Sequence, residues 1–225
     1  AAALVLATTA LAAGKDVVLS RGELVEIGAG FRLTDLMEST GAVLREVGTT
    51  NRTHLADYAD ALGPQTGCVL KVHPSNFRVD GFTSAVPLTE LSRLTVSGGV
   101  PLVADLGSGL LTHDPLLPDE PDVTSALLAG ADVVIASVDK LLGGPQAGLL
   151  LGRKDIIDRL ARHPLARAVR ADKLALAALE ATLTGGATPV SQALHADVGE
   201  LRRRTDRLAA ALGVPVVSHD GRVGG

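Results

Sequence analysis

The sequence predicts an α/β fold with a mainly parallel sheet and helices on both faces. Short apolar runs rich in β-branched residues, such as 100–104 and 131–136, are typical of strands buried inside a parallel sheet. Longer helix-like runs alternate with them, as repeated βα units require. The chain has 225 residues, of which 46% are hydrophobic, and this is enough for a large core.

The expected elements follow from these patterns in chain order. A helix over 1–13 is ended by Gly14, and Pro164 ends a later helix over 154–162. The apolar runs predict strands at 17–19, 43–47, 68–72, 100–104, 131–136 and 149–152. Further helices are expected at 54–62, 88–97 and 171–183, and the pattern of 198–212 is also helical.

Composition excludes several classes of protein. Cys68 is the only cysteine, so neither a disulfide within the chain nor a multi-cysteine metal site is possible, and it is expected in the core. No stretch reaches the ~18 apolar residues of a membrane span, and a cytoplasmic location is the simplest expectation. A net charge of −4, with three phenylalanines, one tyrosine and no tryptophan, does not by itself indicate a nucleic-acid partner. The basic residues Arg202, Arg203, Arg204 and Arg207 are expected on a solvated helix face, with a contribution to RNA binding as the alternative.

Lys140 is the first candidate for chemistry. It follows the strand run 131–136 and precedes a Gly-Gly-Pro turn at 143–145, so it lies at a strand end, where α/β sheets bind ligands. Such a lysine can form a Schiff base with pyridoxal phosphate. The alternative is a solvated loop residue.

Asp105 ends another predicted strand, 35 residues before Lys140. A carboxylate in this place can keep the pyridine nitrogen of pyridoxal phosphate protonated, which makes the ring an electron sink. The alternative for Asp105 is a helix N-cap or a turn residue. Together the two residues predict a pyridoxal phosphate site.

Five segments in this order carry a resemblance to a known family. They are 20–28 (SRGELVEIG), 46–54 (EVGTTNRTH), 71–77 (KVHPSNF), 105–109 (DLGSG) and 139–148 (DKLLGGPQAG). Together they resemble bacterial selenocysteine synthase, L-seryl-tRNA(Sec) selenium transferase, over nearly the whole chain. The resemblance implies the large domain of a fold-type-I pyridoxal phosphate-dependent transferase, a homo-oligomer that contacts neither DNA nor a membrane.

Both ends of the chain depart from that family. The chain begins at Ala1 without an initiator methionine and stops at Gly225, whereas the family continues in both directions. We therefore expect an internal fragment, with a truncated cofactor-binding large domain at 1–175. Residues 176–225 are expected to form a connecting helix and the start of a C-terminal small domain. The main tRNA-binding portion is expected outside this chain.

The resemblance also implies a set of site residues. Ser75 or Asn76, with Ser108 as a second donor, would contact the phenolic oxygen of the cofactor, and Ser137 would reach its phosphate. The N-terminus of the first helix would complete the phosphate site. His73 would stack on the ring, with a structural hydrogen-bonding role as the alternative.

Substrate contacts are expected from arginines. Arg167 and Arg170 are three residues apart, so on a helical turn they face one side, and their planar forks suit an oxyanion such as selenophosphate. The alternative is a surface pair. Arg21 is a further substrate-binding candidate. Loop residues expected at the active site or a subunit contact are Glu23, Thr49, Thr50, Asn51 and Arg52.

The implied reaction is conversion of L-seryl-tRNA(Sec) to L-selenocysteyl-tRNA(Sec). Lys140 would remove the α-proton, the serine hydroxyl would leave to give a dehydroalanyl intermediate, and selenium from selenophosphate would add. Asp105 would support the carbanion. Two alternatives stay open: a pyridoxal phosphate lyase acting on a small amino acid or amino sugar, and a catalytically inactive fragment of the fold. No metal is expected.

Overall fold

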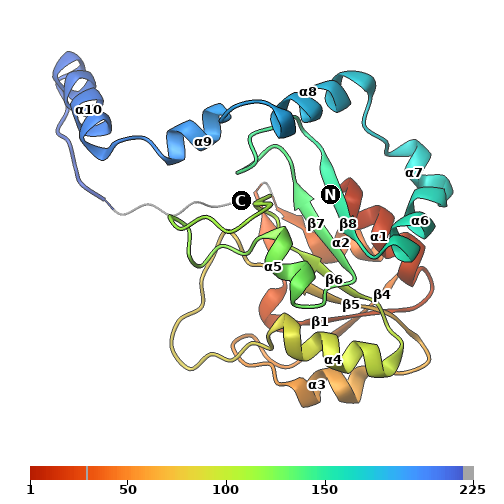
Figure 1. Ribbon diagram of the computed structural model, residues 1–225. Coiled ribbons are helices and arrows are strands. Elements are labelled where there is room, and N and C mark those ends of the chain that lie inside the picture. The colour runs from red at the N-terminus through yellow and green to blue at the C-terminus, as the bar shows by residue number, and fades with distance from the viewer. Residues whose placement is uncertain (29, 220–225) are drawn as a thin grey trace.

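The computed structural model describes residues 1–28 and 30–219, arranged around one six-stranded sheet (Figure 1). The strand order is β4-β1-β5-β6-β7-β8. Five strands are parallel, and β8 pairs antiparallel with β7, so the predicted mainly parallel sheet is confirmed. The strands are β1 (Asp16–Ser20), β4 (Val43–Val47), β5 (Thr66–Val72), β6 (Leu102–Asp105), β7 (Val133–Ser137) and β8 (Gly148–Gly152).

Helices cover both faces of this sheet, as expected. One face packs against α1 (Ala2–Ala12), α2 (Leu33–Glu38) and α6 (Lys154–Arg162), and their side chains share one buried cluster. The other face packs against α3 (Leu55–Ala61), α4 (Leu88–Gly98) and α5 (Val123–Leu128). Helices therefore cover both faces of the inner strands, which explains the uninterrupted apolar runs that lead into β6 and β7.

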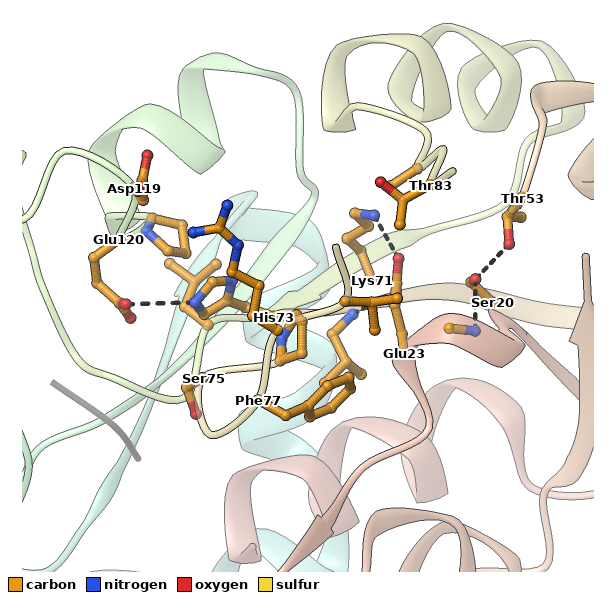
Figure 2. Close-up of a pocket in the computed structure, with 18 of the residues that line it drawn as sticks. Ser20, Glu23, Thr53, Lys71, His73, Ser75, Phe77, Thr83, Asp119 and Glu120 are labelled. Atoms are coloured by element: carbon orange, nitrogen blue, oxygen red, sulfur yellow. Dashed lines mark hydrogen bonds and ion pairs between the residues drawn. The ribbon is translucent and has the colours of Figure 1, made fainter. Parts of the chain in front are cut away.

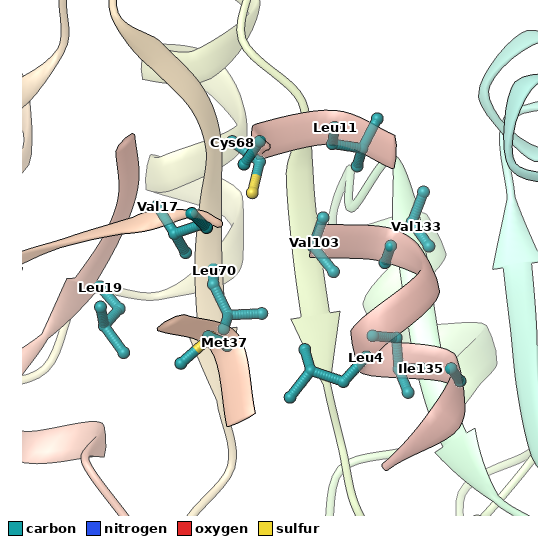
Figure 3. Packing of buried hydrophobic residues seen from close by; sticks show 14 of the residues in the cluster. Leu4, Leu11, Val17, Leu19, Met37, Cys68, Leu70, Val103, Val133 and Ile135 are labelled. Atoms are coloured by element: carbon teal, nitrogen blue, oxygen red, sulfur yellow. The ribbon is translucent and has the colours of Figure 1, made fainter. Parts of the chain in front are cut away.

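Alternation along each strand divides the core between the two faces. Leu19 packs with the α1 cluster, whereas its neighbour Val18 packs with α3 and α4. On β5, Leu70 likewise packs with the α1 cluster, and its neighbour Val69 packs with α3 and α4. Figure 3 shows Leu4 and other side chains of α1 against the first face. These aliphatic residues form a core with almost no aromatic side chains.

Helices of seven or more residues were predicted, including α3, whereas shorter ones were not. Residues 154–162 and 198–212 form α6 and α10 with the expected bounds. The sequence patterns did not indicate α2, α5, α7 (Pro164–Ala168), α9 (Pro189–Leu194) or a small hairpin of β2 (Glu26–Ile27) and β3 (Phe31–Arg32). Helices of five or six residues make fewer than two turns, so their apolar pattern has no visible period.

The C-terminal helices lie outside the packed layers (Figure 1). No residue of α8 (Lys173–Thr184), α9 or α10 (Val198–Leu212) is buried in the part of the chain that the structure describes. Within that part, no helix is long and apolar enough to cross a membrane.

Candidate active site

Three parallel strands end side by side where the candidate residues lie. Asp105, the last residue of β6, is in register with Val72 of β5 and Ile135 of β7. The backbone N–H of His73, directly after β5, donates to the carbonyl oxygen of Asp105 at 2.9 Å. The residues that follow these strands therefore meet at one edge of the sheet, the edge where α/β folds bind ligands.

A cavity of about 720 Å³ opens at this edge. It gathers side chains of three strand ends with the N-terminus of α1 and a residue that follows α7. The lining includes Ala1, Ala2, Ala3, His73, Ser75, Asp105, Ser137, Asp139, Lys140 and Arg170. The structure thus brings six of the predicted site residues together: His73, Ser75, Asp105, Ser137, Lys140 and Arg170.

Gly109 allows the loop after β6 to touch the end of β7. Its φ is 87°, and a β-carbon at this position would lie 1.9 Å from the carbonyl oxygen of Ser137. Only glycine fits such an approach. The backbone N–H of Leu141 also donates to the carbonyl oxygen of Ser108 at 2.9 Å. The loop that follows Asp105 is therefore fixed against the loop that carries Lys140.

The loop of Lys140 is itself closed at its base. The backbone N–H of Val138 donates to the carbonyl oxygen of Ala147 at 3.0 Å, and that of Gly144 donates to the carbonyl oxygen of Val138 at 2.9 Å. Because β8 pairs antiparallel with β7, both ends of this loop are anchored in the sheet. Lys140 is partly buried at the cavity wall.

Burial dominates the electrostatics of Asp105. Desolvation raises the pKa of its carboxyl group, although the positive charge of Lys140 and the N–H of Gly107 act in the opposite direction. A carboxylate in this environment is stabilised by a cationic partner. The protonated pyridine nitrogen of pyridoxal phosphate is such a partner, so the residues present fit this cofactor.

Four predicted site residues lie outside the lining of this cavity. Asn76 is exposed and its side-chain amide donates to the carbonyl oxygen of Glu26 at 3.0 Å. Ser108 is buried, at 4% exposure. Arg21 pairs with Glu46 at 3.1 Å. These roles stay predictions, and so does that of Arg167.

Arg167 and Arg170 do not share a helix face. The helix α7 ends at Ala168, and Val169 has φ −101° and ψ 9°. The i, i+3 spacing therefore does not place the two side chains on one side. Arg170 lines the cavity, whereas Arg167 is exposed in α7 and does not.

Figure 2 shows residues that line a second cavity, of about 740 Å³. This cavity adjoins the first and shares Val72, His73 and Ser75 with it. Its wall includes an ion pair between Glu23 and Lys71, and Glu23 also accepts the backbone N–H of Val72 at 2.9 Å. This second cavity is lined by four of the residues that were expected at the active site or a subunit contact: Glu23, Thr49, Thr50 and Asn51.

Two acidic residues of the site were not predicted from the sequence. Asp139 lines the first cavity directly before Lys140, and its position beside the lysine was a usable signal. Glu120 lines the second cavity and contacts His73. Glu120 lies in the loop between β6 and α5, far along the chain from the end of a strand. No sequence pattern therefore indicated a role for it.

The sheet, its helices and the cavity at its carboxyl edge define the fold of fold-type-I pyridoxal phosphate-dependent enzymes. D-Glucosaminate-6-phosphate ammonia-lyase aligns with a TM-score of 0.70 and 22% identity, over 93% of this chain and 56% of that one. Aspartate aminotransferase from Thermus thermophilus with maleate aligns with a TM-score of 0.61 and 22% identity, over 94% and 55%. The chain belongs to the L-seryl-tRNA selenium transferase family (SelA), whose model matches residues 1–215.

Curated relatives agree with this family. The L-seryl-tRNA(Sec) selenium transferase of Desulfovibrio desulfuricans is 51% identical over 222 residues, covering 94% of this chain and 47% of the relative. That of Geobacter metallireducens is 58% identical over 185 residues, covering 81% and 40%. The chain therefore spans about half the length of these relatives, or less. The family resemblance in the sequence is confirmed.

Proposed function

We propose that the protein containing this chain is a pyridoxal phosphate-dependent selenium transferase that converts L-seryl-tRNA(Sec) to L-selenocysteyl-tRNA(Sec). The observation that supports the proposal most is the meeting of Lys140, Asp105 and the N-terminus of α1 in one cavity, in a chain of this family. An amine, a carboxylate and a helix N-terminus match the aldehyde, the pyridine nitrogen and the phosphate of the cofactor.

Each group would hold a different part of the cofactor. Lys140 would bind it covalently through Nζ, and the Asp105 carboxylate would accept a hydrogen bond from the pyridine nitrogen. Free backbone N–H groups at the start of α1, together with the hydroxyl of Ser137, would bind the phosphate. Ser75 would donate to the phenolic oxygen, and His73 would flank the ring.

The bound cofactor supplies an electron sink that stabilises negative charge at the α-carbon of the seryl group. Once the seryl amino group has displaced Lys140 from the cofactor, the freed Nζ amine, partly buried at the cavity wall, would take the α-proton. The serine hydroxyl would then take up a proton and leave as water, selenium of selenophosphate would bond to the β-carbon, and hydrolysis of the phosphorus–selenium bond would release phosphate. Arg170 would bind the anionic selenium donor through its planar guanidinium fork.

The rest of the assembly is part of the same proposal. We expect residues 1–175 to form the cofactor-binding domain and 176–225 to lead into a smaller domain, which agrees with the absence of buried residues in α8, α9 and α10 as described. A homo-oligomer would cover exposed apolar side chains near the second cavity, such as Phe82 at 87% exposure. A cytoplasmic location stays a prediction.

The test is cofactor attachment in the full-length protein. Pyridoxal phosphate should give an absorption band that borohydride reduction fixes on Lys140, and Lys140→Ala should lose both the band and the label. Lys154→Ala is the matched control, because Lys154 is exposed on α6 and pairs only with Asp158 among the described residues. A label on another lysine would refute the assignment. Release of ammonia from a small amino acid, without selenocysteine formation from seryl-tRNA, would favour a lyase.

A further inference from the structure

His73 forms part of the wall between the two cavities. It lines both of them, and its side chain is 25% exposed. The ring nitrogen Nε2 lies 3.4 Å from Oε2 of Glu120 (Figure 2). Glu120 therefore holds the imidazole from the side of the second cavity.

Glu120 is also close to the loop that fixes Lys140. Its side chain is only 12% exposed, and Oε1 is buried without a hydrogen-bond partner among the described residues. The hydroxyl of Ser108 is also buried and has no hydrogen-bond partner among the described residues. The carbonyl oxygen of Ser108 accepts the N–H of Leu141 at 2.9 Å, so the backbone of this serine is fixed to the lysine loop.

The ionisation of Glu120 fixes the direction of its hydrogen bond. Burial by itself would raise the pKa of this carboxyl group, but its interactions with His73 and Ser108 and the positive charge of Lys140 outweigh burial and lower the pKa. An ionised carboxylate only accepts hydrogen bonds. Its contact with Nε2 of His73 at 3.4 Å therefore favours the tautomer with the hydrogen on Nε2, and it limits rotation of the ring.

We propose that Glu120 is a positioning residue of the active site, which orients the His73 imidazole at the wall of the cavity that contains Lys140. The inference rests on the proposed function, because the oriented ring matters for a cofactor bound beside Lys140. Nothing requires Glu120 to touch that cofactor, since it lines the second cavity and not the first. Its effect should therefore pass through His73 alone.

A double-mutant cycle on cofactor affinity tests this dependence in the full-length protein. We expect Glu120→Ala to weaken pyridoxal phosphate binding about three- to tenfold when His73 is present, and by less than about twofold in a His73→Ala background. Glu120→Gln should have a smaller effect, because its amide oxygen still accepts from Nε2. Asp119→Asn is the matched control: it removes the neighbouring carboxylate, which is exposed and forms no ion pair among the described residues.

Nitrogen-15 NMR of the imidazole provides a second measurement that needs no cofactor. In the cofactor-free protein the hydrogen should lie on Nε2 of His73, and Glu120→Ala should reduce that population while Asp119→Asn should not. Equal weakening of cofactor binding in both His73 backgrounds, or an unchanged tautomer in Glu120→Ala, would overturn the inference. If Glu120→Ala does not fold, Glu120→Gln carries the same comparison. Failure of the wild type to bind the cofactor would reject the proposed function instead, and the NMR result would still decide the role of Glu120.

Discussion

Replacing Gly109 with alanine should separate the two loops that carry the candidate catalytic residues. The new β-carbon would lie 1.9 Å from the carbonyl oxygen of Ser137, whereas ordinary contacts begin at 3.4 Å. The backbone must therefore open by the difference, 1.5 Å, between the loop after β6 and the end of β7. This shift would move Ser108 away from the loop of Lys140.

The size of the effect follows from comparison with Gly107 in the same loop. Both glycines have positive φ, 72° at Gly107 and 87° at Gly109, so alanine costs about 1–2 kcal/mol at either position. A β-carbon on Gly107 would meet only Ser75 Oγ, at an ordinary 3.6 Å. The clash adds about 1–3 kcal/mol in Gly109→Ala alone.

The assay is thermal unfolding of both variants beside the wild type. The added clash should lower the melting temperature of Gly109→Ala by roughly 2–12 °C relative to Gly107→Ala. Titration with pyridoxal phosphate should also show weaker binding in Gly109→Ala, because the loops of Asp105 and Lys140 no longer meet. If Gly109→Ala were as stable as Gly107→Ala, the close approach would be wrong.

Three further predictions concern single side chains. Asp105→Asn should stabilise the cofactor-free protein at pH 7, because a carboxyl group with a raised folded pKa opposes folding when ionised; the gain, measured by urea unfolding, should vanish below the ordinary aspartate pKa of about 3.9. A gain that persists at pH 3 would contradict this. Burial raises the pKa of Cys68 to about 12, so a thiol reagent at pH 8 should modify it only after unfolding, as mass spectrometry can show. Rapid labelling of the native protein would contradict its burial. Arg170→Ala should weaken donor binding about ten- to a hundredfold, as a lost charge-assisted contact does, while Arg167→Ala should change it little; an unchanged donor dependence in Arg170→Ala would remove it from the site.

The inner strands of the sheet could be predicted because they are buried on both sides. Val133 and Val134 point to opposite faces, yet both are fully buried, so the sequence shows an uninterrupted apolar run that ends at a polar residue. Strand ends in a parallel sheet share one edge, so this rule predicted that Asp105 and Lys140 lie close together, and both line the same cavity.

Turns and loops explain what could not be predicted. Ser108 follows Asp105 by three residues, but the positive φ of Gly107 reverses the backbone between them, and the serine is buried outside the cavity lining. The helix that was expected to align Arg167 with Arg170 ends before the second arginine. Contacts such as that of Glu120 with His73 join distant loops, and no local pattern records them.

The antiparallel pairing of β8 with β7 affects the entropy cost of ligand binding at Lys140. If Lys140 lay on a flexible loop, the loop would become ordered only when a ligand binds. The loss of conformational entropy would then cost about 1–2 kcal/mol for each backbone residue that is fixed. Here Val138 and Ala147 already close the loop by a hydrogen bond, so this entropy is lost during folding rather than during binding. On ligand binding, only the side-chain rotamers of Lys140 then remain to be fixed.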